Sequence, residues 1–284
     1  MSTGDNLGKG VTSVGNGAQG AHQKPATAAR MYDYYLGGIH NFPADQEAAK
    51  AMLERSPLIR TIARYNRAYL SRAVRYLTSI GVRQFLDLGS GIPTEGNVHE
   101  IAQADIPDAR VVYVDIDPEA VSESLEMLAG NQYATAIRAN VREPQAILDN
   151  PQVGKLIDFS QPVGLLMVAV LHFVEDNDEA WGIVRTLRSA LAPGSHLVLA
   201  HTTVDELVFD PELLKRSQEI YRRQTSTPLT PRKRSDVVPF FDGFELVEPG
   251  ITWLNQWRPG PDLVDEFKDN PQMSSFYVGV GRLA

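Results

Sequence analysis

The chain has 284 residues, which fits one large domain or one domain with a cap, and its 43% of hydrophobic residues predict a packed interior. The 35 acidic residues exceed the 27 basic ones, and the net charge of −8 excludes a general attraction to nucleic acid or anionic lipid. The lack of cysteine excludes disulfides, thiolate catalysis and Cys-ligated zinc, and no apolar run is long enough to cross a membrane.

Residues 1–25 are rich in Gly, Ser, Thr, Asn and Gln and nearly empty of large apolar side chains. Such a segment cannot bury enough surface to offset its chain entropy, so we expect a disordered tail. It also lacks the apolar core of a signal peptide, which favours a cytoplasmic protein.

Residues 26–81 are expected to form a helical cap on the rest of the chain. The segment from Arg30 to Phe42 contains two adjacent glycines and is predicted to be a loop over the carboxyl edge of a sheet. Arg30 is a candidate to bind a ligand carboxylate, but a less favoured one than the other residues of this loop. Ser56-Pro57 predicts the start of a long helix that ends at Gly81.

The apolar stripe of that long helix contains one amide, Asn66, whereas Arg60, Arg64, Arg67 and Arg75 are expected on the opposite side. A buried amide needs hydrogen-bond partners. Asn66 therefore either bonds to neighbouring backbone or contacts a ligand.

Residues 83–118 predict a strand, a glycine-rich turn, a helix and a second strand. The first apolar run ends in Asp87 and is followed by the turn with Gly89, Ser90 and Gly91, while the second ends in Asp115. Glycines let the backbone approach a ligand, and the following helix directs its N-terminus at the same place. Asp115 is placed to bind a ribose diol, so the unit predicts a nucleoside site.

Two nucleosides compete for this site, a dinucleotide and S-adenosylmethionine. A dinucleotide fingerprint is Gly-x-Gly-x-x-Gly, but here Thr94 occupies the third glycine position. No tyrosine is followed by lysine in the Tyr-x-x-x-Lys spacing of one large oxidoreductase group. A carboxylate such as Asp87 suits the ammonium of S-adenosylmethionine. Together these observations favour S-adenosylmethionine over a dinucleotide.

Two further strands are predicted beyond Asp115. A strand over 134–139 ends at Asn140 and Val141, and an apolar strand over 163–170 runs into Leu171, His172 and Phe173. His172 is the candidate general base, because imidazole titrates near neutral pH, although a histidine at a strand end is often structural. The acidic loop 175–179 is interpreted as a helix start rather than a metal site.

The last third contains a strand over 197–200, an insertion at about 204–238 and strands over 244–247 and 275–280. The insertion is predicted to begin as a helix at Pro211. Its basic residues either form a solvated face or a lid that selects an anionic acceptor. Trp253 and Trp257 belong either to an acceptor pocket or to the core.

The motifs together resemble a known family. Phe85-Leu-Asp-Leu-Gly-Ser-Gly91 and Val111-Val-Tyr-Val-Asp-Ile-Asp-Pro118 are similar to the first two motifs of class I S-adenosylmethionine-dependent methyltransferases. Four further stretches resemble a bacterial family of such enzymes whose substrates are largely unassigned: Ala29 to Phe42, Gly96 to Glu100, Ala169 to Val174 and Phe244 to Pro249.

The resemblance implies an α/β, Rossmann-like, seven-stranded methyltransferase sheet over 82–284, with helices on both faces and the N-terminal cap. It implies S-adenosyl-L-methionine as cofactor, with Tyr32, Gly37 and Asn41 in a lid, Ile116 on the adenine face, Asn140 and Val141 at the adenine edge, and Ala169 near the sulfonium. Asn140 stands where many such enzymes have aspartate.

The sequence therefore predicts an enzyme that methylates a small-molecule acceptor. Nucleic acid, a membrane and a metal are not expected as partners, and oligomeric state stays open. The alternatives are a regulatory protein that binds S-adenosylmethionine without turnover and an NAD(P)-dependent oxidoreductase.

Overall fold

The computed structural model describes residues 25–94, 96–206, 215, 218–220, 222–223, 225, 228–260 and 265–284. The predicted tail, apart from residue 25, and the predicted start of a helix at Pro211 lie outside these ranges. Within them, no helix has the combination of length and apolar character that crossing a membrane requires.

One mixed sheet organises the chain, in the order β3-β2-β1-β4-β5-β8-β6, with β7 also paired to β8. The strands are β1 (Gln84–Leu88), β2 (Arg110–Asp115), β3 (Ala134–Arg138), β4 (Gly164–Val168), β5 (His196–Thr202), β6 (Phe244–Leu246), β7 (Thr252–Trp253) and β8 (Phe276–Leu283). The first five are parallel, and β8 runs antiparallel to its three neighbours. The predicted Rossmann-like sheet is confirmed, and the short β7 is an eighth strand that the sequence did not predict.

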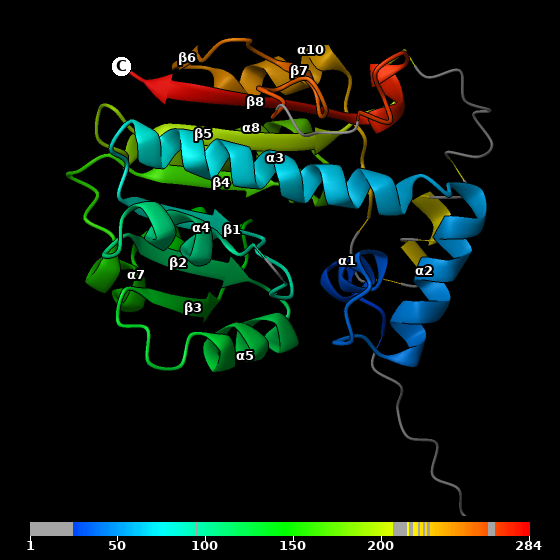
Figure 1. The fold of residues 1–284 in the computed structure, drawn as a ribbon, viewed down its shortest axis with the longest axis horizontal. Helices are drawn as coiled ribbons and strands as arrows, with labels where there is room; N and C mark the ends of the chain where they lie inside the picture. The colour runs from blue at the N-terminus through cyan, green and yellow to red at the C-terminus, as the bar shows by residue number, and fades with distance from the viewer. Residues whose placement is uncertain are drawn as a thin grey trace, which may run out of the picture.

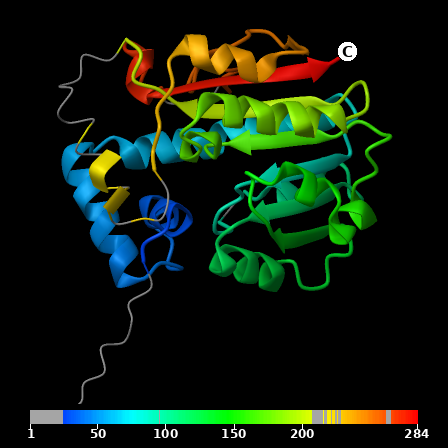
Figure 2. The same ribbon diagram turned by 180° about the vertical axis from the view of Figure 1, so that it is seen from behind.

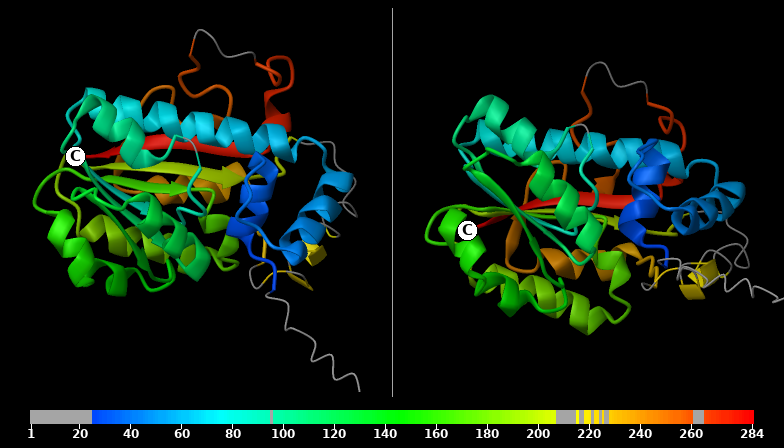
Figure 3. Two further views of the ribbon diagram at one scale, coloured as in Figure 1. Left: turned by 60° about the horizontal axis from the view of Figure 1, so that its bottom comes forward. Right: turned by 90° about the horizontal axis from the view of Figure 1, so that it is seen from below.

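Helices cover both faces of the sheet (Figures 2 and 3). One face packs against α6 (Pro144–Leu148), α7 (Pro151–Leu156), α8 (Asn177–Ser189) and the 3₁₀ turn η2 (Val238–Phe241). The other face packs against α3 (Ile59–Ser79) and α4 (Val98–Asp105), with α5 (Pro118–Met127) beside β3. Burial on both sides explains why β4, Gly-Leu-Leu-Met-Val, is a continuous apolar run.

The first two helices, α1 (Ala28–Leu36) and α2 (Pro43–Arg55), lie beyond the carboxyl ends of β1, β2 and β3, toward which these strands point in Figure 1. The prediction of a loop from Arg30 was wrong, because Thr27 caps a helix there: its side chain accepts a hydrogen bond from the Arg30 N–H. The loop begins only at Gly37, which ends α1 with φ of 85°.

The long helix α3 begins later than predicted. Ser56 is the C-cap of α2, because its N–H donates to the Met52 carbonyl. The first residue of α3 is therefore Ile59. Further along, the Tyr69 hydroxyl bonds to the carbonyls of Leu199 in β5 and Gly279 in β8. This anchor fixes α3 across the sheet, while its N-terminal end extends past the strands toward α2 (Figure 1).

Candidate functional site

A cavity of about 860 Å³ lies between the carboxyl ends of the parallel strands and helices α1, α2 and α3. Pockets for small molecules have volumes of about 300–1,000 Å³, so this one is large. Twelve predicted site residues line it: Tyr32, Asn66, Asp87, Gly89, Ser90, Gly91, Asp115, Ile116, Asn140, Val141, Ala169 and His172. Gly37 and Asn41 do not, so the structure brings together all but two of the predicted residues.

The glycine turn after β1 forms the floor of the cavity. Gly89 and Gly91 have φ of 71° and 68°, a region that side chains other than glycine rarely adopt. A Cβ on Gly89 would lie 2.7 Å from the Cβ of Val170, whereas a Cβ on Gly91 would meet no atom within 4 Å. Gly89 is thus required for packing, and Gly91 leaves open space for a ligand.

We expect the two glycines to respond differently to substitution. Gly89→Ala should lower the free energy of unfolding by about 3 kcal/mol or more, because steric overlap adds to the cost of a positive φ. Gly91→Ala should lower it by only about 1–2 kcal/mol, since it bears the backbone cost alone. Urea denaturation of both variants checks this, and equal losses would contradict the assignment of Gly91 to open space.

Asp115 ends β2 directly beside the turn. Its Oδ2 accepts a hydrogen bond from the Gly91 N–H at 2.8 Å, and its Oδ1 accepts one from the Asp117 N–H at 2.9 Å. Burial raises its pKa. Each carboxylate oxygen keeps a lone pair for a further donor, which is what a ribose diol offers. The next side chain, Ile116, is 53% exposed and presents an apolar surface at the same edge.

Asp87 lies in β1, across the turn from Asp115, and is also buried. Burial is the main reason why its pKa rises to about 7, and the nearby charges of Arg67 and Asp115 act in opposite directions. A cation bound in the cavity beside Asp87 would therefore stabilise the ionised form of this carboxyl group.

Arg67 is a site residue that the sequence did not predict. It was expected on the face of α3 away from the apolar stripe, but it lines the cavity, and its charge lowers the pKa of Asp87. Its guanidinium also donates to the Gly96 carbonyl at 2.9 Å. An anion and a cation side by side are the pair that a zwitterionic amino-acid group requires.

The orientation of Asn66 follows from its neighbours. The Tyr32 hydroxyl donates to the Ala63 carbonyl at 3.0 Å, so its oxygen must accept from the Asn66 amide nitrogen, also at 3.0 Å. The amide oxygen of Asn66 is then buried without a partner among the described residues. A buried acceptor of this kind is expected to bind a donor from a ligand.

Backbone conformation distinguishes two other predicted positions. Ala169, after β4, has φ of 61°, a strained conformation for a residue with a side chain, and such strain gathers at functional sites. Asn140, after β3, directs its side-chain oxygen to the Arg142 N–H at 3.0 Å, which forms a turn within its own loop.

His172 lies in the 3₁₀ turn η1 (Leu171–Phe173), buried and in contact with the rings of Phe173, His201 and Phe276. Burial, with the charges of His201 and Arg232, holds its pKa well below the ordinary value. Its Nδ1 has no hydrogen-bond partner in the described part of the chain. The imidazole is neutral at pH 7 and able to accept a proton.

Arg232 holds the loop that carries His172. It is buried, and its guanidinium donates to the carbonyls of Leu171 and Val174 and to His201 Nε2 at 3.0 Å. Burial, reinforced by this cation, lowers the pKa of His201 to about 3. Within the basic insertion, Arg232 is thus an internal support and not part of a solvated face.

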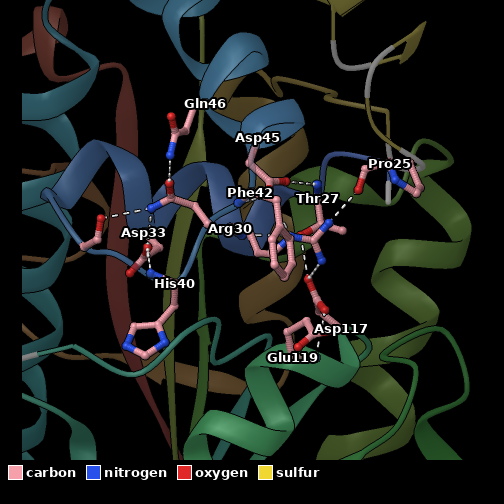
Figure 4. A network of polar contacts seen from close by, with 12 residues as sticks. Pro25, Thr27, Arg30, Asp33, His40, Phe42, Asp45, Gln46, Asp117 and Glu119 are labelled. Carbon is pink, nitrogen blue, oxygen red and sulfur yellow. Dashed lines mark hydrogen bonds and ion pairs between the residues drawn. The ribbon is translucent and has the colours of Figure 1, made fainter. Parts of the chain in front are cut away.

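Helix α1 is attached to α2 and to the start of α5 by Arg30, which was considered as a partner for a ligand carboxylate. Instead it forms ion pairs of 2.9 Å with Asp45 of α2 and with Asp117, the N-cap of α5 (Figure 4). Asn41 lies nearby and donates to Asp33 at 2.7 Å. Gly37 and Asn41 therefore have structural explanations that need no ligand.

Neither tryptophan of the last third lines the cavity. Trp253 stacks on Tyr277 with ring centroids 4.4 Å apart, and Trp257 is fully buried against Tyr69 in the core. The acidic loop starts a helix, as interpreted: Asp176 caps α8 by accepting from the Glu179 N–H.

The fold and the glycine turn between two strand-end carboxyl groups define a class I S-adenosylmethionine-dependent methyltransferase. The chain belongs to the S-adenosyl methyltransferase family, whose sequence model matches residues 17–284. The cofactor of this family is S-adenosyl-L-methionine, as the sequence predicted.

Two solved structures are similar over nearly the whole chain. A DUF574 family protein from Streptomyces avermitilis is 38% identical, with a TM-score of 0.85 over 92% of this chain and 98% of its own. A methyltransferase candidate from Thermobifida fusca is also 38% identical, with a TM-score of 0.84 over 95% of this chain and 99% of its own. No curated protein matches the chain.

Proposed function

We propose that this protein transfers the methyl group of S-adenosylmethionine to a small-molecule acceptor, and that one cavity holds both. The observation that carries the proposal is the pair Asp87 and Asp115, buried on either side of a glycine turn that leaves open space at Gly91. The residues present suit the cofactor, because each of its polar groups finds a complementary group among them.

We assign the cofactor contacts by chemistry. Asp115 binds the ribose diol, Ile116 packs on the adenine face, and the backbone of Asn140 and Val141 borders the adenine edge. Asp87 and the amide oxygen of Asn66 accept from the ammonium, while Arg67 binds the carboxylate. Tyr32 acts indirectly, since its hydroxyl fixes the Asn66 amide.

The cofactor supplies a methyl group already activated on a sulfonium, so the protein has mainly to align, to exclude water and to manage one proton. Helices α1, α2 and α3 border the cavity beyond the strand ends and shield part of it from solvent. Residues 26–81 then act as a cap on a methyltransferase domain over 82–284. The strained backbone at Ala169 lies beside the position of transfer.

His172 is the residue that would take a proton from the acceptor. Its imidazole is neutral at physiological pH and therefore ready to accept, but its low pKa makes it a weak base. A weak base of this kind suits an acceptor whose proton becomes acidic only as the bond to the methyl group forms. We expect His172→Phe to lower kcat about 100-fold and to leave the dissociation constant of S-adenosylhomocysteine within about twofold, measured by steady-state kinetics and calorimetry.

The first test is calorimetric titration with S-adenosylmethionine, S-adenosylhomocysteine and NAD(P). We expect saturable binding of the two sulfur nucleosides and none of NAD(P), with affinity reduced about 100-fold in Asp115→Ala because the ribose hydroxyls lose a charged acceptor. Binding of NAD(P) alone would overturn the proposal. Tight cofactor binding without methylation of any acceptor would instead identify a regulatory protein.

A further inference from the structure

The cavity has a second region beyond the cofactor residues. A separate hydrophobic cluster, distinct from the two that cover the sheet, joins α1, α2 and the start of α3 to Phe173 and Leu229. Apart from Ala28 and Tyr32, its members that line the cavity are Tyr35, Met52, Ile59, Ala63, Phe173 and Leu229. These six side chains are called the apolar wall below.

The apolar wall contains no charged side chain. The charged residues that line the cavity, within the described part of the chain, are Arg30, Arg67, Asp87, Asp115, Asp117, Glu119, Arg138 and Arg142. Asp87 and Asp115 belong to the strand ends, and Arg67 lies near Asp87. Arg30 and Asp117 pair with each other, and Arg142 pairs with Glu179. Arg138 donates to the Ile116 carbonyl at 3.2 Å, and Glu119 lies in the first turn of α5.

The basic insertion contributes apolar residues to the cavity. Its described residues at the lining are Val204, Pro228, Leu229 and Pro231. Arg232 is buried against backbone carbonyls, and Arg234 donates to the Ile251 carbonyl at 2.8 Å. These contacts direct the two arginines away from an anionic ligand. The hypothesis of a lid that selects an anion therefore loses its support in the described segment.

Resting on the proposed function, we infer that the acceptor is a neutral, largely apolar molecule, aromatic or polycyclic, that packs on the apolar wall and presents one hydroxyl or N–H group to His172. A charged acceptor would have to give up its hydration among apolar side chains, which is costly. Arg142, whose guanidinium donates to the Phe173 carbonyl at 3.1 Å, is already paired with Glu179. Aromatic surface suits a wall that contains Tyr35 and Phe173, with Phe276 beside His172. His172, neutral and with no partner for Nδ1 among the described residues, is a polar group beside this wall.

The test uses three probes that share a naphthalene ring and differ in charge: 2-naphthol, 2-naphthoate and 2-naphthylmethylamine. Each is titrated at pH 7.5 into full-length protein saturated with S-adenosylhomocysteine, with binding followed by calorimetry. We expect 2-naphthol to bind at least about tenfold more tightly than either charged analogue, because only it avoids the cost of burying a charge.

A substitution in the wall supplies the second readout. Leu229→Glu should weaken 2-naphthol binding at least about tenfold and leave S-adenosylhomocysteine binding within about twofold. The matched control is Leu246→Glu, at an exposed leucine of β6 outside the cavity, which should change neither.

The outcomes separate this inference from the proposed function. Failure of S-adenosylhomocysteine to bind would overturn both. Normal binding of S-adenosylhomocysteine with a preference for naphthoate or the amine, or with no saturable binding of 2-naphthol, would overturn the acceptor class alone. An effect of Leu229→Glu no larger than that of Leu246→Glu would remove the apolar wall from the acceptor site.

Discussion

Arg30→Met is expected to destabilise the protein by about 3–5 kcal/mol, the usual cost of breaking a buried ion pair from one side. The guanidinium lies between Asp45 and Asp117, and all three side chains are at most 4% exposed. Without the cation, two carboxylates stay buried, and their partners among the described residues are backbone N–H groups and the Thr27 hydroxyl. Urea denaturation at pH 8 measures the loss.

A surface pair provides the matched control. Arg83 pairs with Asp108, and both side chains are more than half exposed, so Arg83→Met should cost at most about 1 kcal/mol. In the Arg30→Met background, Asp117→Asn should restore part of the stability, because it removes one of the unpaired charges. If Arg30→Met costs no more than Arg83→Met, the ion pairs do not hold α1 to α5.

The parallel sheet and the glycine turn could be predicted because their signals are local. Strands buried on both faces need unbroken apolar runs, and the positive φ of Gly89 and Gly91 needs glycine. Asp115 was predicted for the same reason, since strand, turn and carboxylate are contiguous. Helix α1 was missed because the pair Gly37-Gly38 was interpreted as breaking the whole segment, when it only ends a helix begun at Thr27.

Arg67 and Arg232 could not be placed from the sequence, because their partners are distant along the chain. A helical wheel assumes that one face meets the core and the other meets solvent. The start of α3 extends past the sheet, so Arg67 meets the cavity from what would otherwise be the solvent side (Figure 1). Arg232 bonds to carbonyls of Leu171 and Val174, which carry no sequence signal.

Asp87 makes the stability of the cofactor-free protein depend on pH. Its pKa is about 7 in the folded protein, against 3.8 for the free side chain, so the folded state holds a proton that the unfolded state has lost. This contribution is fully present below about pH 4 and disappears as the pH rises through about 7. Asp87→Asn, neutral at every pH, should therefore be more stable than the wild type at pH 8, and at pH 4 the two should be nearly equal.

Cofactor binding should show the opposite dependence. An ammonium group binds the ionised carboxylate, so below pH 7 a proton must leave Asp87, and the dissociation constant of S-adenosylhomocysteine should rise about tenfold for each pH unit. Asp87→Asn should weaken binding about 100-fold at pH 8. Calorimetry between pH 5.5 and 8.5, in buffers of different ionisation enthalpy, measures both affinity and proton release.

The two halves of this prediction must occur together. A variant that is more stable at pH 8 but binds the cofactor poorly shows that Asp87 is kept ionisable for the ligand at the expense of the empty protein. If Asp87→Asn lowered both stability and affinity, Asp87 would be a structural group whose loss disturbs the turn. Affinity that does not change between pH 5.5 and 8.5 would exclude the carboxylate as the partner of the ammonium.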